Sequence, residues 1–345
     1  MISLTINGLN VEVEPGDTIL QAAEKLGIRI PTFCYEPELS QVGACRMCVV
    51  EVEKARTLVA SCCTPATEGM VVQTDTERVF EARRANLSLL LASHPLDCLT
   101  CEKTGSCKLQ DYCYDYGISE SDFKGERLEH ALDDTNPFFV RDMNKCILCG
   151  LCVRKCDEIN GAAAIEFMNR GFDSKVTTFF DDPLEESTCV FCGMCVDSCP
   201  VGALTPKESM RGGRSWQLSS VKTVCPYCGT GCGLELFVRD NQVVGVKGDK
   251  ESPANNGHTC VKGHFGMGFL KHPDRLKNPL VRKNGELVES SWEDALRLVA
   301  SKLKEFKPSE IAGLASARAT NEENYLFQKL LRTLGTNHID HCARL

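Results

Sequence analysis

One cysteine pattern occurs twice in the middle of the chain, and in each copy three cysteines are separated by only two residues. Each copy reads C-x2-C-x2-C-x3-C, and Pro200 follows the second copy. Three closely spaced thiolates can hold three irons of one cubane while the fourth reaches across to another, as in two-cluster ferredoxins. A zinc site normally uses two separated cysteine pairs, so the repeat predicts two 4Fe-4S clusters. Their ligands would be Cys146, Cys149, Cys152 and Cys199 for one, and Cys156, Cys189, Cys192 and Cys195 for the other.

Four cysteines near the N-terminus are spaced more widely. They are Cys34, Cys45, Cys48 and Cys62. Their spacing is a variant of the plant-type pattern of 2Fe-2S proteins, and Gly43 with Ala44 would allow a narrow loop where the thiolates converge. Cys63 adjoins Cys62, and neighbouring side chains of a strand point to opposite faces. We therefore predict a 2Fe-2S cluster with Cys62, rather than Cys63, as its fourth ligand.

A further run places one histidine before three cysteines. It reads H-x3-C-x2-C-x5-C and consists of His94, Cys98, Cys101 and Cys107. Three thiolates and one imidazole can complete a cubane, but mixed histidine and cysteine sites are also ordinary for zinc. The spacing alone favours neither metal. The cluster motifs on either side favour iron, so we predict a 4Fe-4S cluster here.

The last set reads C-x2-C-x3-C-x27-C and consists of Cys225, Cys228, Cys232 and Cys260. Glycines at 229, 231 and 233 would let the backbone approach a cluster closely. A zinc ribbon is the alternative for this spacing. We predict a 4Fe-4S cluster, which brings the total to one 2Fe-2S and four 4Fe-4S clusters. The cysteines left over are expected to be free thiols: Cys63, Cys113 and Cys342.

Composition excludes several other classes of protein. Twenty-two cysteines in 345 residues indicate either a secreted disulfide framework or metal ligation in a reducing compartment. Residues 1–7 contain no export signal, which favours metal ligation in the cytoplasm. No apolar run approaches the ~20 residues that cross a bilayer, and a net charge of -8 argues against nucleic acid as a partner. We expect a cytoplasmic protein without a membrane span.

The cysteine sets must be positioned by several small modules. Alternating residues at 2–7 and 11–14 predict two strands joined by an Asn7-Gly8 turn. Asp17 can cap a helix that Gly27 ends. Further strands are predicted at 48–52 and 57–61, and a helix at 79–91. A hairpin followed by a helix and more strands is typical of a β-grasp module.

Helices and strands alternate near the C-terminus, as at the start of an α/β domain. Ser291 begins a capping-box-like Ser-Trp-Glu-Asp sequence at the start of a helix. Residues 311–315 predict a buried strand, Asn321 can cap a second helix, and 338–340 predict another short strand. The chain thus contains the beginning of a further domain.

With these motifs identified, the chain resembles, over essentially its whole length, the catalytic subunit of NAD(P)-linked, molybdenum- or tungsten-dependent formate dehydrogenases. The segments that carry the likeness are Val224–Cys232, Cys260–Gly263, Ser291–Leu296, Gly335–Asn337 and Cys342–Leu345. The part through Cys199 is also similar to iron-only hydrogenases and to the large iron-sulfur subunit of respiratory complex I. A hydrogenase is expected to carry cysteine motifs for its active-site cluster next, and the complex I subunit to lack the double-cubane repeat.

The resemblance implies molybdopterin guanine dinucleotide with molybdenum or tungsten, and places Lys262 between this cofactor and the adjacent cluster. The metal-binding selenocysteine or cysteine would follow Leu345 directly, so the next codon is expected to be UGA and no catalytic residue lies within the chain. Electrons from formate oxidation would reach flavin- and NAD(P)-binding diaphorase-type subunits, or flow in reverse for CO2 reduction. A ferredoxin or a hydrogenase subunit is a further partner. The alternatives are a non-catalytic iron-sulfur adaptor and an electron-input subunit of the NADH dehydrogenase or hydrogenase type.

The expected fold class is α+β multidomain. In chain order we expect a 2Fe-2S ferredoxin-type β-grasp domain (1–78), a His/Cys-ligated 4Fe-4S domain (79–138), a double 4Fe-4S ferredoxin-type domain (139–206), a linker (207–220), a 4Fe-4S module of the molybdopterin oxidoreductase type (221–277) and the incomplete start of a molybdopterin-binding domain (278–345). The linker assignment rests on a Gly-Gly pair and three serines.

Overall fold

The computed structural model describes residues 1–208 and 212–343. Residues 209–211 of the expected linker lie outside the described residues. So do Arg344 and Leu345, where the metal-binding residue is expected to follow. In the part of the chain that is described, no helix is long and apolar enough to cross a membrane.

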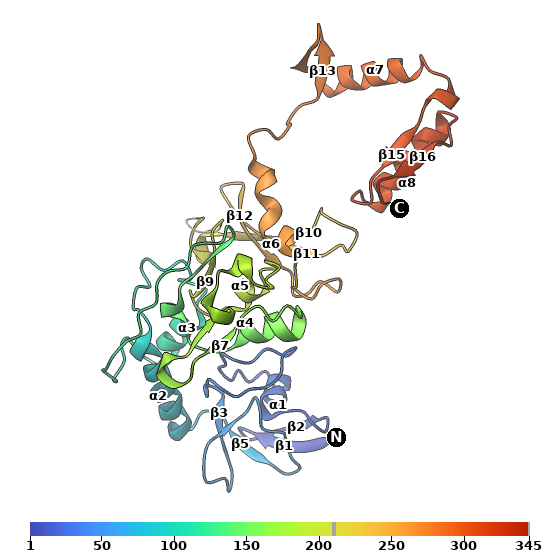
Figure 1. Ribbon diagram of the computed structural model, residues 1–345. Helices are drawn as coiled ribbons and strands as arrows, with labels where there is room; N and C mark the ends of the chain where they lie inside the picture. The colour runs from blue at the N-terminus through green and yellow to red at the C-terminus, as the bar shows by residue number, and fades with distance from the viewer. Residues whose placement is uncertain (209–211, 344–345) are drawn as a thin grey trace. The chain divides into compact units, whose positions relative to one another are not determined.

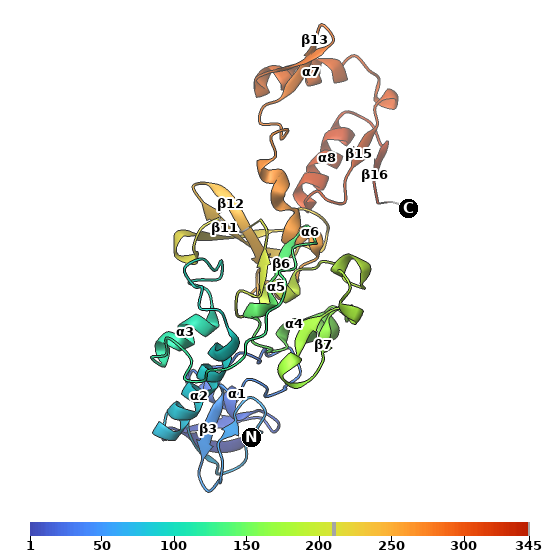
Figure 2. The same ribbon diagram turned by 60° about the vertical axis from the view of Figure 1, so that its left-hand side comes forward.

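The chain divides into two compact units. One contains residues 1–220 and 237–245, and the other contains residues 221–236 and 246–345. Figures 1 and 2 show the elements of each unit in two views. The 2Fe-2S, His94 and double-cubane cysteine sets lie in the first unit, and the last cysteine set lies in the second.

The first unit opens with the predicted hairpin. β1 (Ile2–Ile6) pairs antiparallel with β2 (Leu9–Val13). Asn7 and Gly8 form the turn with φ angles of 50° and 81°, because a two-residue turn that follows the strand twist needs positive φ at both positions. The hairpin prediction is confirmed.

Three more strands complete a five-stranded mixed sheet in the order β2-β1-β5-β3-β4. They are β3 (Val49–Val52), β4 (Val59–Ala60) and β5 (Val71–Gln73). β5 was not predicted from the sequence, and it pairs parallel with β1 and antiparallel with β3. α1 (Ile19–Lys25) buries its apolar residues in the same core as the sheet. A mixed sheet with one packed helix agrees with the β-grasp prediction.

The start of α1 differs by one residue from the prediction. Thr18 caps the helix instead of Asp17: its hydroxyl accepts the Gln21 N–H at 3.3 Å, and the Gln21 side chain accepts the Thr18 N–H at 2.8 Å. Asp17 pairs with Lys25 at 2.9 Å instead. The reciprocal pair satisfies two N–H groups that the helix itself leaves open, which explains the choice of Thr18.

Beyond the sheet, one long helix and several short helices and strands of the first unit carry the remaining cysteine loops. They are α2 (Glu77–Ser93), α3 (Lys108–Asp115), β6 (Phe139–Arg141), α4 (Leu151–Arg154), β7 (Glu166–Met168), β8 (Lys175–Thr177), α5 (Met194–Ser198) and β9 (Leu204–Pro206). β6 pairs antiparallel with β9, and β7 with β8. The segment between α3 and β6 contains no helix or strand.

The two copies of the cysteine repeat share one backbone conformation. Leu148 and Phe191, each directly before the second cysteine of its copy, have φ angles of 52° and 51°. Gly150 and Gly193 follow with φ angles of 69° and 81° and begin α4 and α5. A left-handed residue before and after the second cysteine wraps each loop tightly, so the sequence repeat is also a structural repeat.

The elements that follow include the module that carries the last cysteine set. A sheet runs in the order β10 (Ser219–Val224), β11 (Gly233–Arg239), β12 (Gln242–Gly248). α6 (Val261–Phe265) follows, and β13 (Leu280–Lys283) forms a hairpin with β14 (Glu286–Glu289).

The predicted start of an α/β domain is present in the second unit. α7 (Trp292–Leu303) is capped by Ser291, as expected. β15 (Gly313–Ala315) pairs parallel with β16 (Ile339–His341), and α8 (Asn321–Thr333) connects them. Thr320, and not the predicted Asn321, caps α8, because its side chain and that of Glu323 satisfy each other's backbone N–H groups.

Candidate iron-sulfur sites

The four cysteines predicted to hold a 2Fe-2S cluster converge beside the five-stranded sheet. The Sγ atoms of Cys34 and Cys45 lie 3.4 Å apart, and those of Cys48 and Cys62 lie 3.3 Å apart. Cys34, Cys48 and Cys62 are almost fully buried, and the Phe33 N–H donates to Cys45 Sγ at 3.4 Å. The neighbouring Cys62 thiol lowers the pKa of Cys48 to about 6. The hydrogen-bonded partners shift the other way, since Cys34 raises the pKa of Cys45, and Cys34 with Cys48 raises that of Cys62; Cys48 is thus the more acidic thiol of its pair.

Strand alternation does not separate Cys62 from Cys63, and the geometric basis of that prediction is wrong. β4 ends at Ala60, and residues 61–63 form a turn. Both sulfurs are close, with Cys63 Sγ 3.4 Å from Cys62 Sγ. Cys62 is 1% exposed whereas Cys63 is half-buried, and the Sγ of Cys62 is the one that contacts Cys48. Burial and contact therefore favour Cys62 as ligand on other grounds.

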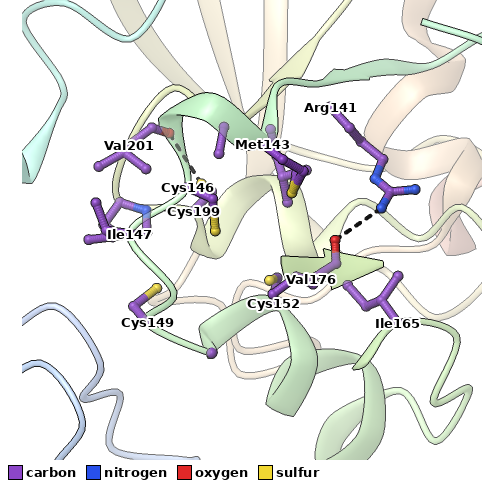
Figure 3. A pocket seen from close by; sticks show the side chains of 14 residues that line it. Arg141, Met143, Cys146, Ile147, Cys149, Cys152, Ile165, Val176, Cys199 and Val201 are labelled. Carbon is purple, nitrogen blue, oxygen red and sulfur yellow. Dashed lines mark hydrogen bonds between the residues drawn. The ribbon is translucent and has the colours of Figure 1, made fainter. Parts of the chain in front are cut away.

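The cysteines of the repeat line two separate cavities in the first unit. Figure 3 shows the first, in which Cys146, Cys149 and Cys152 of one copy share the lining with Cys199 of the other. The second cavity is lined by Cys189, Cys192 and Cys195 of the second copy together with Cys156 of the first. Arg141 borders both cavities. Each cavity thus takes three cysteines from one copy and one from the other, as the crossed assignment predicts.

Burial favours the protonated thiol at six of these cysteines in the absence of metal. It raises the pKa of Cys146 to about 11 and that of Cys149 to about 12, and it raises the pKa of Cys152 and Cys195 well above the ordinary value. Metal binding must therefore displace protons. Backbone N–H groups already point at several sulfurs and would stabilise thiolates there: those of Leu148 on Cys146 (3.4 Å), Ala164 on Cys156 (3.3 Å) and Phe191 on Cys189 (3.4 Å).

The structure places His94 and two of its three predicted partner cysteines at one cavity. His94 follows the last residue of α2, is 9% exposed, and its buried Nδ1 makes no hydrogen bond. It lines a cavity with Cys98, Cys107 and also Cys113. Cys101 does not line this cavity; a Cβ placed on Gly202 would lie 2.7 Å from its Sγ. An orphaned buried nitrogen beside two thiols fits a metal centre.

Sequence reasoning missed Cys113 at this cavity. It lies on α3, six residues beyond Cys107, which is the same spacing that separates Cys101 from Cys107. Burial raises the pKa of Cys113 to about 11, with the charges of Cys107 and Cys98 adding to the effect. The turn of the chain into α3 brings this thiol to the site, and the repeated five-residue gap was the signal in the sequence that could have found it.

The last cysteine set lies within the second unit. Cys225 is buried, Cys232 is half-buried, and Cys228 and Cys260 are exposed. The Cys225 N–H donates to the Cys232 carbonyl at 2.8 Å. Burial is the main cause that raises the pKa of Cys232, and the charges of Cys225, Cys228 and Cys260 raise it further.

The arrangement of possible ligands around a single metal ion can also be tested. Among residues 1–208 and 212–343, no three or more His, Cys, Asp or Glu side chains converge closely enough to hold one metal ion. The fit of the clusters therefore rests on donor chemistry, on the two four-cysteine cavities and on the orphaned His94 nitrogen. Thiolates are the ligands of iron-sulfur clusters, and these residues fit them.

Family models match successive parts of the chain. Residues 1–77 match a 2Fe-2S iron-sulfur cluster binding domain, and 83–122 match the NADH-ubiquinone oxidoreductase-G iron-sulfur binding region. Residues 136–205 match the ferredoxin-like domain of NADH-quinone oxidoreductase subunit 3. Residues 218–272 match the Fe4S4 domain of molybdopterin oxidoreductases, and 275–345 match molybdopterin oxidoreductase itself. The chain is thus an iron-sulfur protein of the oxidoreductase class.

Several proteins of known name are similar to the chain. Over its full length it is 43% identical to the second G-type subunit of the NADH-quinone oxidoreductase of Rhizobium meliloti and 39% identical to NADPH-Fe(3+) oxidoreductase subunit alpha of Geobacter sulfurreducens, and it spans 40% of the length of each. A chain in the crystal structure of the NAD+-reducing NiFe-hydrogenase in the H2-reduced state is 34% identical, with a TM-score of 0.56. The match covers 60% of this chain and 87% of that one. The chain belongs to the family of iron-sulfur subunits that includes the G-type subunits of NADH-quinone oxidoreductase and this hydrogenase chain.

These matches revise the resemblance drawn from the motifs. Iron-sulfur domains and the N-terminal part of a molybdopterin oxidoreductase domain are present, in a mixed α and β fold. Residues 136–205, which contain the repeat, match the ferredoxin-like domain of NADH-quinone oxidoreductase subunit 3. The match does not give the number of clusters in that domain, so the absence of a double-cubane repeat from the complex I subunit stays a prediction.

Proposed function

We propose that the chain is the electron relay of an NAD(P)H-linked oxidoreductase, with one 2Fe-2S and four 4Fe-4S clusters. The carrying observation is the pair of cavities in which the two cysteine repeats exchange their fourth cysteine. The exchange makes two cubanes neighbours in one domain. Neighbouring clusters serve electron transfer, whereas a structural zinc site needs only one ion and four ligands.

The proposed ligands are the twenty residues predicted from the sequence. When bound, the clusters supply reversible one-electron oxidation and reduction. The protein's own residues hold them by thiolates and one imidazole and direct N–H groups at sulfur, which favours the more negative, reduced form; burial excludes water chiefly at the 2Fe-2S site. In the 2Fe-2S site this surrounding is almost wholly buried.

The proposed partner is a flavin- and NAD(P)-binding subunit of the diaphorase type, in the cytoplasm. The support comes from relatives whose names join them to NADH or NADPH, and from the NAD+-reducing hydrogenase chain. The partner would exchange two electrons with the nicotinamide and pass them singly to the clusters. A ferredoxin or a hydrogenase subunit is a further proposed partner.

A second candidate function places formate oxidation at the far end of the relay, on a molybdopterin guanine dinucleotide with molybdenum or tungsten. It is supported by the match of residues 275–345 to molybdopterin oxidoreductase and by Lys262. Lys262 lies on α6, which Cys260 precedes. A hydrogen bond with Thr230 lowers the pKa of Cys228, and the charge of Lys262 lowers it further. One lysine is a small part of a pterin site, and the names of the relatives favour the first candidate.

Rapid-freeze EPR on the anaerobically purified complex that contains this chain tests the proposal. NADH or NADPH is expected to reduce the clusters within the turnover time, whereas formate alone is expected to leave them oxidised. Reduction by formate in the absence of nicotinamide would establish the second candidate. Failure of NADH, NADPH and formate alike to reduce fully loaded clusters would contradict both.

A further inference from the structure

A buried arginine lies between the loop of the 2Fe-2S site and the first cubane loop. Arg154 is the last residue of α4 and is 8% exposed. One terminal nitrogen of its guanidinium donates to the Cys34 carbonyl at 2.6 Å and approaches the Cys149 carbonyl at 3.5 Å. The other donates to the Ser40 carbonyl at 2.5 Å. In Figures 1 and 2, α4 lies beside the N-terminal module.

Two neighbouring contacts hold the same pair of segments together independently of Arg154. Lys155 forms an ion pair with Glu38. Glu158 accepts hydrogen bonds from the Ser40 N–H at 2.7 Å and from its hydroxyl at 2.5 Å. The 34–40 loop would therefore stay against this segment if the guanidinium charge alone were removed.

The charge of Arg154 has weak local compensation. Its three hydrogen-bond partners are neutral carbonyl oxygens, and its Nε is buried without a partner. The charge of Glu158 interacts with it, but both Glu158 oxygens are engaged with Ser40. A buried cation is costly unless negative charge lies nearby. Thiolate-ligated clusters carry negative charge that grows by one electron on reduction, and two of the three carbonyls belong to proposed cluster ligands.

We propose that Arg154 is a positioning residue whose buried positive charge raises the reduction potentials of the 2Fe-2S cluster at Cys34 and of the cubane at Cys149 together. The inference rests on the proposed function. Because the guanidinium contacts both ligand loops, it stabilises the added electron on either cluster. The two potentials then move in the same direction, and the difference between them, which is the driving force for electron transfer, changes little.

Potentiometric EPR titration with dithionite as reductant tests the proposal on the loaded complex. In R154Q the one-electron reduction constants of both clusters are expected to fall about tenfold or more, which is about 59 mV. In R154K, which keeps the charge, they are expected to fall less than threefold. R84Q is the matched control: Arg84 on α2 also donates to a backbone carbonyl, that of Tyr116 at 3.0 Å, and the potentials should not change.

Three results would overturn the inference: equal shifts in R154Q and R84Q, equal shifts in R154Q and R154K, or a shift of one cluster without the other. If R154Q loses iron, R154M is titrated in its place. If both variants lose iron, the R154K titration decides: a tenfold fall of its reduction constants would contradict the proposed role of the positive charge. Failure of the proposed function is seen separately in the unsubstituted complex, because NADH, NADPH and formate would then all leave fully loaded clusters oxidised while dithionite still reduced them.

Discussion

Replacing Cys156 by alanine should remove the cluster whose other ligands are Cys189, Cys192 and Cys195. Cys156 belongs to the first copy of the repeat in sequence, yet it lines the cavity of the second copy. Cys199 stands in the reciprocal position in the first cavity. Substitution of Cys156, or of Cys199, is therefore expected to damage the cluster whose other three ligands belong to the other copy of the repeat.

The size of the expected effect is the number of iron atoms that each variant loses per chain. A fully loaded chain should contain about eighteen iron atoms, two in the binuclear cluster and four in each cubane. C156A should lose about four, and C156A combined with C192A should lose no more than about four, because both residues serve one cluster. C156A combined with C149A should lose about eight, because they serve different clusters. The non-additive pair and the additive pair together define the ligand sets.

Iron and sulfide analysis of anaerobically purified variants, with EPR of the reduced proteins, is the assay. C342A is the matched control, since Cys342 is exposed and lies in the second unit; it should keep all its iron. The crossed assignment would be refuted if C156A with C149A lost only about four irons while C156A with C192A lost about eight.

Three further substitutions have defined outcomes. H94A should lose one cubane EPR signal and slow electron passage, because it removes a buried nitrogen from the cavity that contains Cys98 and Cys107; an unchanged spectrum would make His94 structural only. S61A should lower the potential of the 2Fe-2S cluster by about 40 mV, the equivalent of one hydrogen bond of about 1 kcal/mol, because the fully buried Ser61 hydroxyl makes no hydrogen bond within the described residues and lowers the pKa of the Cys48 thiol; a titration without a shift would contradict this. G248A should cost about 1–3 kcal/mol of stability, since its Cβ would come 2.0 Å from the Gly257 carbonyl oxygen; an unchanged thermal denaturation midpoint would show that the backbone adapts.

Cluster motifs could be predicted from the sequence because their geometry is local. The spacing of Cys146, Cys149 and Cys152 fixes how three sulfurs converge, and the same residues line one cavity in the structure. Each copy also turns at a glycine directly after its second cysteine, at Gly150 and Gly193. A local pattern of this kind needs no knowledge of distant contacts.

Features that depend on distant contacts were missed. β5 spans only three residues, too few to show a period, and it is a strand because Val71 and Val72 pair with Thr5 and Ile6 of β1. Cys113 reaches the His94 cavity only through the position of α3. The spacing of Cys113 from Cys107 repeats that of Cys107 from Cys101, but spacing alone does not predict the pairing of β5 or the position of α3.

The sequence pattern also could not decide which of two adjacent residues caps a helix or binds a cluster. Thr18 and Asp17 are both good capping residues, and the decision depends on which side chain reaches the Gln21 N–H. Cys62 and Cys63 lie in a turn where the expected strand had ended. Hydrogen-bond geometry and burial decide such cases, and both follow from the fold.

Metal analysis joined to Mössbauer spectroscopy of the iron-57-loaded chain tests the assignment of five clusters most directly. That assignment predicts about eighteen irons with nearly matching sulfide, of which about one in nine belongs to a 2Fe-2S cluster and the rest to cubanes. About fourteen irons with one stoichiometric zinc would assign the His94 set or the Cys225 set to zinc and contradict the count of five clusters. Zinc in place of iron at the repeat would contradict the electron relay itself.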